Sequence, residues 1–179
     1  MKIIKKLLLA LVVLIALLLI GSLFIPGRYH VERSVVIDAP PEAVFSFVNQ
    51  VKLWPSWIAW TTAKDPTLIN TFSGPDSGVG AAMSWDGKKM GQGTFIFTAA
   101  EPKGGVKYDL SFDHGKYNSK GALTFTAEGK GTKVIWSDDG DVGRNPIGRY
   151  FSLMFDKLMG PDFEEGLNNL KKKAEESVK

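Results

Sequence analysis

The feature that most constrains this chain is an uncharged apolar run close to its N-terminus. Residues 7–25 contain no charged side chain, and three lysines, Lys2, Lys5 and Lys6, precede them. In an α-helix these nineteen residues span about 28 Å at about 1.5 Å each, which is close to the hydrocarbon core of a bilayer at about 30 Å. No face of the segment is polar, so burial in a soluble domain does not explain it. We therefore predict that residues 1–26 form a membrane anchor.

A cleaved signal peptide is the alternative for the same segment. Its apolar region is typically about 7–15 residues long and ends at small residues in an A-x-A-like pattern. Ile20-Gly21-Ser22 matches that pattern poorly, and Leu23-Phe24-Ile25 prolongs the apolar run. The length of the run favours an uncleaved anchor, and the signal peptide remains the competing interpretation.

The charges beside the anchor predict the side of the membrane on which the rest of the chain lies. By the positive-inside rule the three N-terminal lysines stay in the cytoplasm. Residues 27–179 are then extracytoplasmic, and the protein is a single-pass protein of the plasma (inner) membrane. Arg28 and Arg33 on the far side oppose this orientation slightly. The linker between anchor and first strand is only a few residues long, so the domain must sit against the bilayer.

The charge balance of residues 27–179 argues against a nucleic-acid partner. The whole chain has 22 Lys and Arg against 19 Asp and Glu, and three of the lysines belong to the anchor. The remainder therefore carries 19 basic and 19 acidic residues, without the basic excess that a nucleic-acid-binding domain shows. The chain has no cysteine, which excludes a lipidated-cysteine anchor, a disulfide and a thiolate metal site.

After Pro26-Gly27 the hydrophobic period predicts one α+β domain over residues 27–179. Alternation over residues 29–38 indicates a strand, and Pro41 with Glu42 starts a helix with an apolar stripe. Short strands then alternate with Gly, Pro and Asp turns. They are TLINTFSG, GAAMSWDG, GQGTFIFTAAE, GVKYDLSFDHG, KGALTFTAEG and GTKVIWSDDG.

After Asp141 the period returns to 3.6, which predicts a long C-terminal helix. One apolar stripe runs over residues 150–158, and Gly160-Pro161 is expected to kink or break the helix before it continues to residue 174. Short connections favour neighbouring hairpins, so we expect a meander of about six or seven antiparallel strands. This curved sheet would wrap on the final helix and enclose a cavity, unless large side chains fill it.

Residues 29–176 resemble the SRPBCC superfamily, the START-like or polyketide cyclase/dehydrase-like helix-grip proteins. The resemblance is carried by VERSVVIDAPPEAVFSFVNQVKLWPSWIAW, GPDSGVGAAMSWDGKKMGQGTF, GTKVIW and the final FEEGLNNLKKKAEE. It implies a helix-grip fold and a cavity for apolar ligands such as lipids, sterols or polyketides. Some members are cyclases or hydrolytic enzymes and many have no assigned activity, so the resemblance is specific for the fold and weak for the activity.

Three tryptophans lie three residues apart in KLWPSWIAW, residues 52–60. In a helix Trp54, Trp57 and Trp60 would fan over about 120° of one face and could cover one neighbouring surface together. Burial in the core explains them energetically, since each buried tryptophan contributes roughly 4–6 kcal/mol by area. The rim of a pocket or the membrane interface is the other interpretation.

The inward-facing side chains predict the lining of the cavity. They are rich in aromatic residues and methionine, which adapt to varied apolar shapes, although a fully packed core would use the same residues. The predicted lining residues are Trp54, Trp57, Trp60, Met83, Trp85, Phe95, Phe97, Tyr108, Leu110, Phe112, Phe125, Trp136, Phe151, Met154 and Phe155.

Candidates for catalysis are few. His30 lies on the polar side of the first strand and His114 in a turn, without neighbours that suggest a metal site. Asp138, Asp139 and Asp141 precede a helix, and capping and solvent exposure explain them first. We therefore expect no catalytic residue, no metal and no cofactor.

Three functions remain open. The favoured one is a membrane-anchored binding protein for a lipid or other hydrophobic small molecule, attached through residues 3–25. The second is a cyclase- or hydrolase-type enzyme of the same superfamily, with Tyr108, His114 or an aspartate inside the cavity. The third is a structural or interaction domain of a membrane complex, with a closed core.

Overall fold

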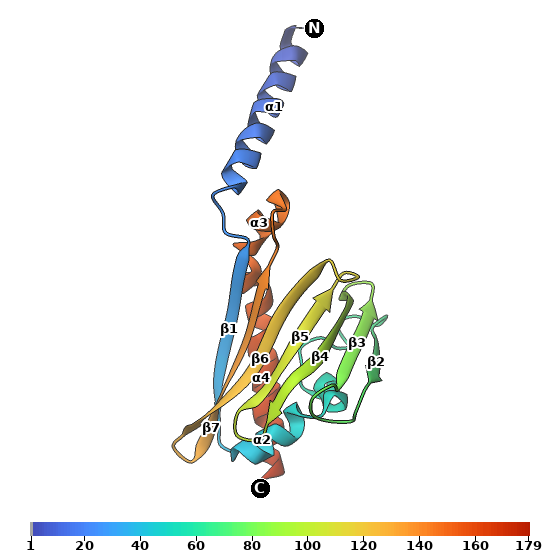
Figure 1. Ribbon diagram of the computed structural model, residues 1–179, viewed down its shortest axis with the longest axis vertical. Coiled ribbons are helices and arrows are strands. Elements are labelled where there is room, and N and C mark those ends of the chain that lie inside the picture. The colour runs from blue at the N-terminus through green and yellow to red at the C-terminus, as the bar shows by residue number, and fades with distance from the viewer. Residues whose placement is uncertain (1) are drawn as a thin grey trace.

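The computed structural model describes residues 2–179 and shows one curved antiparallel sheet with a long helix on its concave side and a separate N-terminal helix (Figure 1). The elements in chain order are α1 (Lys2–Ser22), β1 (Arg28–Ile37), α2 (Pro41–Val48), the 3-10 helix η1 (Val51–Ser56), β2 (Ile69–Ser73), β3 (Ala82–Gly87), β4 (Gly91–Glu101), β5 (Gly105–Phe112), β6 (Tyr117–Glu128), β7 (Gly131–Asp141), α3 (Pro146–Ser152) and α4 (Phe155–Ser177).

The seven strands lie in the order β1-β7-β6-β5-β4-β3-β2, and every neighbouring pair is antiparallel. This confirms the predicted helix-grip fold, with β2 to β7 as a meander. The first strand pairs with the last, from Arg28 opposite Asp141 to Ile37 opposite Thr132. A strand from the start of the chain thus lies beside the one that leads into α3 and α4.

Polar contacts hold α4 along β1. The Arg33 guanidinium donates from Nη1 to Oδ1 of Asp156 and from Nε to Oε1 of Glu164, each at 2.7 Å. Near the other end of the helix, Nζ of Lys171 donates to the carbonyl of Val36 at 2.7 Å. Because β1 lies at the edge of the sheet, these contacts set α4 to one side of the concave face.

The break in the C-terminal helical region lies earlier than predicted. The helix ends at Ser152 and restarts at Phe155, whereas α4 runs on through Gly160-Pro161. Gly160 packs directly on the guanidinium of Arg33, where a side chain would overlap it. The Ser152 hydroxyl shares its one proton between the carbonyls of Arg149 and Pro26, at 2.8 and 3.1 Å, which ties the end of α3 to the chain that leaves α1.

The core explanation for the tryptophans is confirmed for two of the three. Trp54 and Trp57 are fully buried, and Trp60 is half-buried. They do not lie on one α-helix. Trp54 lies in the short 3-10 helix η1, Trp57 follows its last residue and Trp60 lies further along the chain. Trp54 and Trp57 pack against Trp136, which stacks on Phe163 of α4 with ring centroids 4.3 Å apart. This aromatic layer joins the sheet, η1 and α4.

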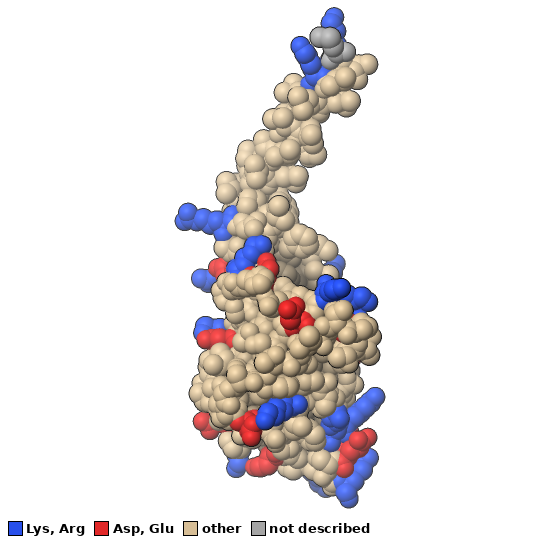
Figure 2. Space-filling view, turned by 90° about the vertical axis from the view of Figure 1, so that its right-hand side faces the viewer, with Lys and Arg blue, Asp and Glu red and all other residues tan. Residues whose placement is uncertain are grey.

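The N-terminal helix α1 is long and apolar enough to cross a membrane, as a signal sequence also would be. Figure 2 shows it as an uncharged stretch between the lysines at its start and the charged surface of the sheet domain. Side chains of α3 bind its C-terminal end. The Arg149 guanidinium donates to the carbonyl of Ser22 at 3.0 Å, and the Tyr150 hydroxyl donates to that of Leu18 at 2.9 Å. A cation at this end complements the helix dipole.

The hydrogen bonds of the Arg33 guanidinium to Asp156 and Glu164, called the Arg33 fork below, lead to a prediction about stability. Arg33→Lys keeps the charge but loses the planar set of donors that Asp156 and Glu164 share, so the free energy of unfolding should fall by about 1–2 kcal/mol. Denaturant titration of the full chain, followed by tryptophan fluorescence, measures this. Arg28→Lys on the same strand is the matched control, because Arg28 is exposed and its pair with Asp141 is 3.9 Å long. Equal losses in the two variants would contradict the assignment.

Candidate functional site

A cavity of about 880 Å³ lies between the concave face of the sheet and the helices α3 and α4. Its volume falls within the range of about 300–1,000 Å³ that small-molecule sites usually have. Side chains from the sheet form its floor, α3 and the first turns of α4 form its cover, and η1 with the following loop closes one side. The interior between sheet and helix is therefore hollow in this region rather than solid.

The structure brings ten of the fifteen predicted lining residues together around this cavity. They come from η1 and its following loop, from β3, β4 and β5, and from α3 and α4. The ten are Trp54, Trp60, Met83, Trp85, Phe95, Tyr108, Leu110, Phe112, Phe151 and Phe155.

The other five predicted residues lie outside the cavity wall. Phe97 and Phe125 are buried in the core, Trp57 and Trp136 belong to the aromatic layer, and Met154 is about half-exposed between α3 and α4. Strand parity correctly placed Phe97, Phe125 and Trp136 on the inner face of the sheet, whereas Trp57 follows η1 and lies outside the sheet. Parity could not show that η1, α2 and the C-terminal part of α4 fill the other half of that face with side chains.

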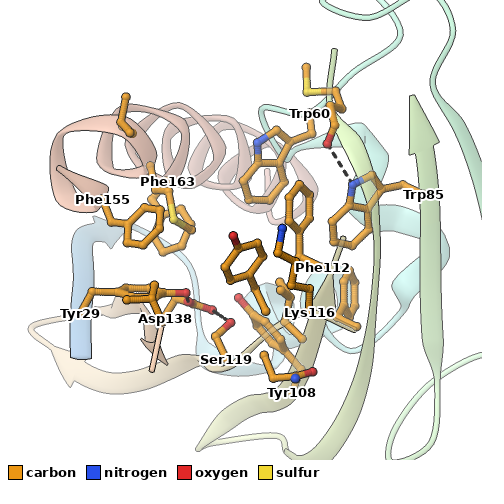
Figure 3. A pocket seen from close by; sticks show the side chains of 18 of the residues that line it. Tyr29, Trp60, Trp85, Tyr108, Phe112, Lys116, Ser119, Asp138, Phe155 and Phe163 are labelled. Atoms are coloured by element: carbon orange, nitrogen blue, oxygen red, sulfur yellow. Dashed lines mark hydrogen bonds between the residues drawn. The ribbon is translucent and has the colours of Figure 1, made fainter. Parts of the chain in front are cut away.

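The polar part of the wall was missed by sequence reasoning. Tyr29 of β1, Ser119 of β6 and Asp138 of β7 all line the cavity. Figure 3 shows them side by side at one wall, beneath Phe155 and Phe163 of α4. The Tyr29 hydroxyl donates to Oδ1 of Asp138 at 3.2 Å, and the Ser119 hydroxyl donates to Oδ2 at 3.0 Å.

Asp138 is only 1% exposed, which corrects the expectation that capping and solvent exposure explain it. The strand β7 continues to Asp141, so Asp138 has the same parity as the buried Val134 and Trp136. The alternation of inward and outward residues along this strand was therefore the sequence feature from which the burial of Asp138 could have been predicted. Burial raises the pKa of Asp138 to about 6, although the hydrogen bonds from Ser119 and Tyr29 oppose the shift.

Two glycines allow tyrosine rings to reach this wall. Gly140 lies beneath the ring of Tyr29, and Gly121 lies beneath the ring of Tyr108. A side chain at either glycine would overlap the tyrosine ring above it. Because Gly121 pairs with Asp138 across β6 and β7, the Tyr108 hydroxyl lies over the residue next to the aspartate. The two tyrosines thus approach Asp138 on the same inner face of the sheet, Tyr29 from β1 on one side of β7 and Tyr108 from β5 beyond β6 on the other.

The cavity reaches the surface near α3. Ile147, Phe151 and Leu158 line it and are also exposed, and Lys116 and Asn118 line it from the region of the β5–β6 turn. Figure 1 shows α3 at the end of the sheet nearest to α1. The rim of the cavity is therefore built partly from the same short helix that binds the end of α1.

Both histidines lie outside the cavity. His30 projects from the outer face of β1, and its Nδ1 lies 2.7 Å from a carboxylate oxygen of Asp139. His114 lies in the β5–β6 turn, with a φ of 56°, and lines a shallow groove on the outer face of the sheet. Among residues 2–179, no three His, Asp or Glu side chains are grouped as a metal site.

Burial of Asp138 predicts how stability depends on pH. Its pKa rises from 3.8 to about 6 on folding, so the folded state binds the proton more tightly between these values. The stability that the protonated Asp138 contributes is fully present below pH 3.8, the pKa of the unfolded state. It is lost as the pH rises through about 6, the pKa of the folded state. Relative to Asp138→Asn, the wild type should lose about 2–3 kcal/mol between pH 4 and pH 7. Unfolding of both proteins across this range measures it, and a constant difference would contradict the buried carboxylate.

Solved structures with the same fold include an aromatase/cyclase. The Zhui aromatase/cyclase from Streptomyces sp. R1128 aligns with a TM-score of 0.59 at 14% identity, over 85% of this chain and 96% of that one. The protein CV1439 from Chromobacterium violaceum has a TM-score of 0.59 at 15% identity, over 82% and 98%. The di-domain StfQ from the steffimycin biosynthetic pathway has a TM-score of 0.63 at 9% identity, over 84% of this chain and 52% of that one. At these identities the likeness shows the fold alone.

No curated protein matches this chain by sequence. A family model does, over residues 28–175, which includes the whole sheet and nearly all of α4. The match agrees with the antiparallel sheet, the covering helix and the apolar cavity between them. The chain belongs to the family described as polyketide cyclase / dehydrase and lipid transport.

Proposed function

We propose that this protein is a membrane-anchored binding protein that holds a lipid or other hydrophobic small molecule in the cavity between sheet and helix. The observation that carries the proposal is the cavity of about 880 Å³ with its largely aromatic and aliphatic lining. A void of this size lined by apolar side chains forgoes packing contacts that a filled core would make, and an apolar ligand would restore them.

The placement of the rim supports loading from the bilayer. If α1 spans the membrane, its C-terminal end lies at the membrane surface, and α3 is bonded to that end. Leu23, Phe24, Ile147, Phe151 and Leu153 are all exposed in this region. Such side chains are favourable in the interface of a bilayer. An apolar molecule would then pass from the membrane to the cavity without crossing water.

The orientation of the protein is part of the same proposal. The positive-inside rule places the N-terminus in the cytoplasm and residues 27–179 on the extracytoplasmic side of the plasma (inner) membrane. The Tyr150 ring beside the last turns of α1 fits this arrangement, because tyrosines are enriched at membrane interfaces.

Asp138 favours the enzyme hypothesis as a second candidate. A cavity lined only by apolar residues would have removed that hypothesis. Instead, a buried carboxylate with a raised pKa and the Tyr108 hydroxyl both face the cavity. General acid–base chemistry uses groups of this kind. The third hypothesis, a structural domain with a closed core, predicts a filled interior, which differs from the cavity observed.

Mass spectrometry tests the binding function directly. We expect the full chain, purified from its native membrane in mild detergent, to retain a stoichiometric apolar molecule in organic extracts. Phe112→Glu, which places a charge in the wall, should lose that molecule, because a carboxylate in an apolar cavity is costly to desolvate. Extracts of the wild type that contain only bulk membrane lipid, in the same proportions as the variant, would contradict the proposal.

Loading from the membrane predicts a position-specific effect of charge. Ile147→Asp at the rim should slow the transfer of a fluorescent apolar probe from vesicles to the reconstituted full chain by about tenfold, because the carboxylate resists insertion into the bilayer interface. Ile69→Asp on β2 is the matched control, since the two isoleucines are 68% and 67% exposed and Ile69 lies away from the rim. Equal transfer rates in the two variants would contradict entry near α3.

A further inference from the structure

The carboxylate of Asp138 is incompletely satisfied for a buried charge. It accepts one hydrogen bond on each oxygen, from Tyr29 and from Ser119, although each carboxylate oxygen has two lone pairs. Within residues 2–179 no Lys, Arg or His forms an ion pair with it. Both of its donors are neutral hydroxyl groups. A further donor from inside the cavity would therefore stabilise the charged form.

The Tyr108 hydroxyl supplies the complementary function beside it. It accepts a hydrogen bond from Nε1 of Trp136 at 2.9 Å, so its oxygen is engaged and its own proton is free to be donated. In the part of the chain that the structure describes, no side chain or carbonyl accepts that proton. The ring lies over Gly121, which is the β6 partner of Asp138, so the two groups are about one strand spacing apart. No hydrogen bond joins them, so a small polar group that reaches both could bridge them.

The geometry points to a binding site for the hydroxyl group of an otherwise apolar ligand, formed by Asp138 as acceptor and the Tyr108 hydroxyl as donor. A hydroxyl group both donates and accepts, so it satisfies both residues at once. The rest of the ligand would contact the aromatic wall formed by Trp60, Trp85 and Phe112, which faces this site across the cavity in Figure 3. The inference rests on the proposed binding function and gives its ligand class as an apolar alcohol.

Other polar groups fit this site less well. An ester or ketone accepts from Tyr108 but gives Asp138 no proton. A fatty acid brings a second negative charge next to the buried carboxylate, which is repulsive. An ammonium group pairs with Asp138 but offers Tyr108 no acceptor. Among the described residues two lysines line the cavity and could favour an acid. Lys116 is paired with Asp113 on the outside at 3.3 Å, and Nζ of Lys89 donates to the carbonyl of Lys64 at 3.5 Å.

A competition experiment on the full chain in lipid nanodiscs tests the inference. The protein is offered an equimolar mixture of hexadecanol, methyl hexadecanoate, hexadecanoic acid and hexadecylamine, and native mass spectrometry counts the bound species. We expect the wild type to prefer the alcohol. Asp138→Asn should lower the ratio of bound alcohol to bound ester by about tenfold, as expected for a hydrogen bond to a charged group. Comparing variant with wild type cancels the different membrane concentrations of the probes.

Two further variants keep the test decisive. Asp109→Asn is the matched control, because Asp109 lies on the outer face of β5, next to Tyr108, and pairs with Lys120. It should leave the alcohol-to-ester ratio unchanged. Tyr108→Phe should lower the ratio of bound alcohol to bound amine, since the amine does not use the tyrosine proton. Binding of the ester reports whether the cavity of Asp138→Asn is intact, and binding of the amine does the same for Tyr108→Phe.

The outcomes separate the inference from the proposed function. Binding of all four probes with an alcohol-to-ester ratio unaffected by Asp138→Asn overturns the hydroxyl site alone. A wild-type preference for the acid or the amine overturns it too. A wild type that binds none of the probes and retains no apolar molecule from its native membrane overturns the proposed function, and the inference with it.

Discussion

The position of α4 on the sheet is the constraint on which the rest of this structure depends. One helix cannot cover seven strands, so where it lies decides which part of the concave face is filled. The Arg33 fork and the bond from Lys171 to the carbonyl of Val36 hold α4 along β1, at the edge of the sheet. The inner face of the middle strands, β3 to β6, is consequently left for η1, α2 and the cavity to share.

The aromatic layer divides that face into a filled half and a hollow half. Trp54 and Trp57 pack against Trp136, which stacks on Phe163 at the level of η1. Small helices and aliphatic residues fill the space on one side of this layer. On the other side only α3 and the first turns of α4 lie above the sheet. The same type of residue therefore serves as core on one side and as cavity wall on the other, which is why composition does not separate the two roles.

The helix α3 connects the N-terminal helix α1 with the cavity. This short helix is capped by Asn145, whose Oδ1 accepts from the backbone N–H groups of Ile147 and Gly148. Its Arg149 and Tyr150 side chains bind carbonyls near the end of α1, while Ile147 and Phe151 line the cavity. A seven-residue helix thus contacts the candidate membrane span and also lines the candidate ligand cavity. In the proposed function it forms the passage between them.

The sequence by itself determined the strands, their antiparallel meander and the long C-terminal helix, because hydrophobic period and turn residues are local properties of the chain, and its family resemblance implied the helix-grip fold. It also determined which side chains of β5 point inward, since Tyr108, Leu110 and Phe112 share one parity in a regular strand. Only the tertiary structure decided which inward residues meet solid core and which meet a void, because that depends on where α4 and η1 lie. It also decided the role of Asp138: the aspartate became part of a buried site once β1 and β6 brought Tyr29 and Ser119 to its two oxygens.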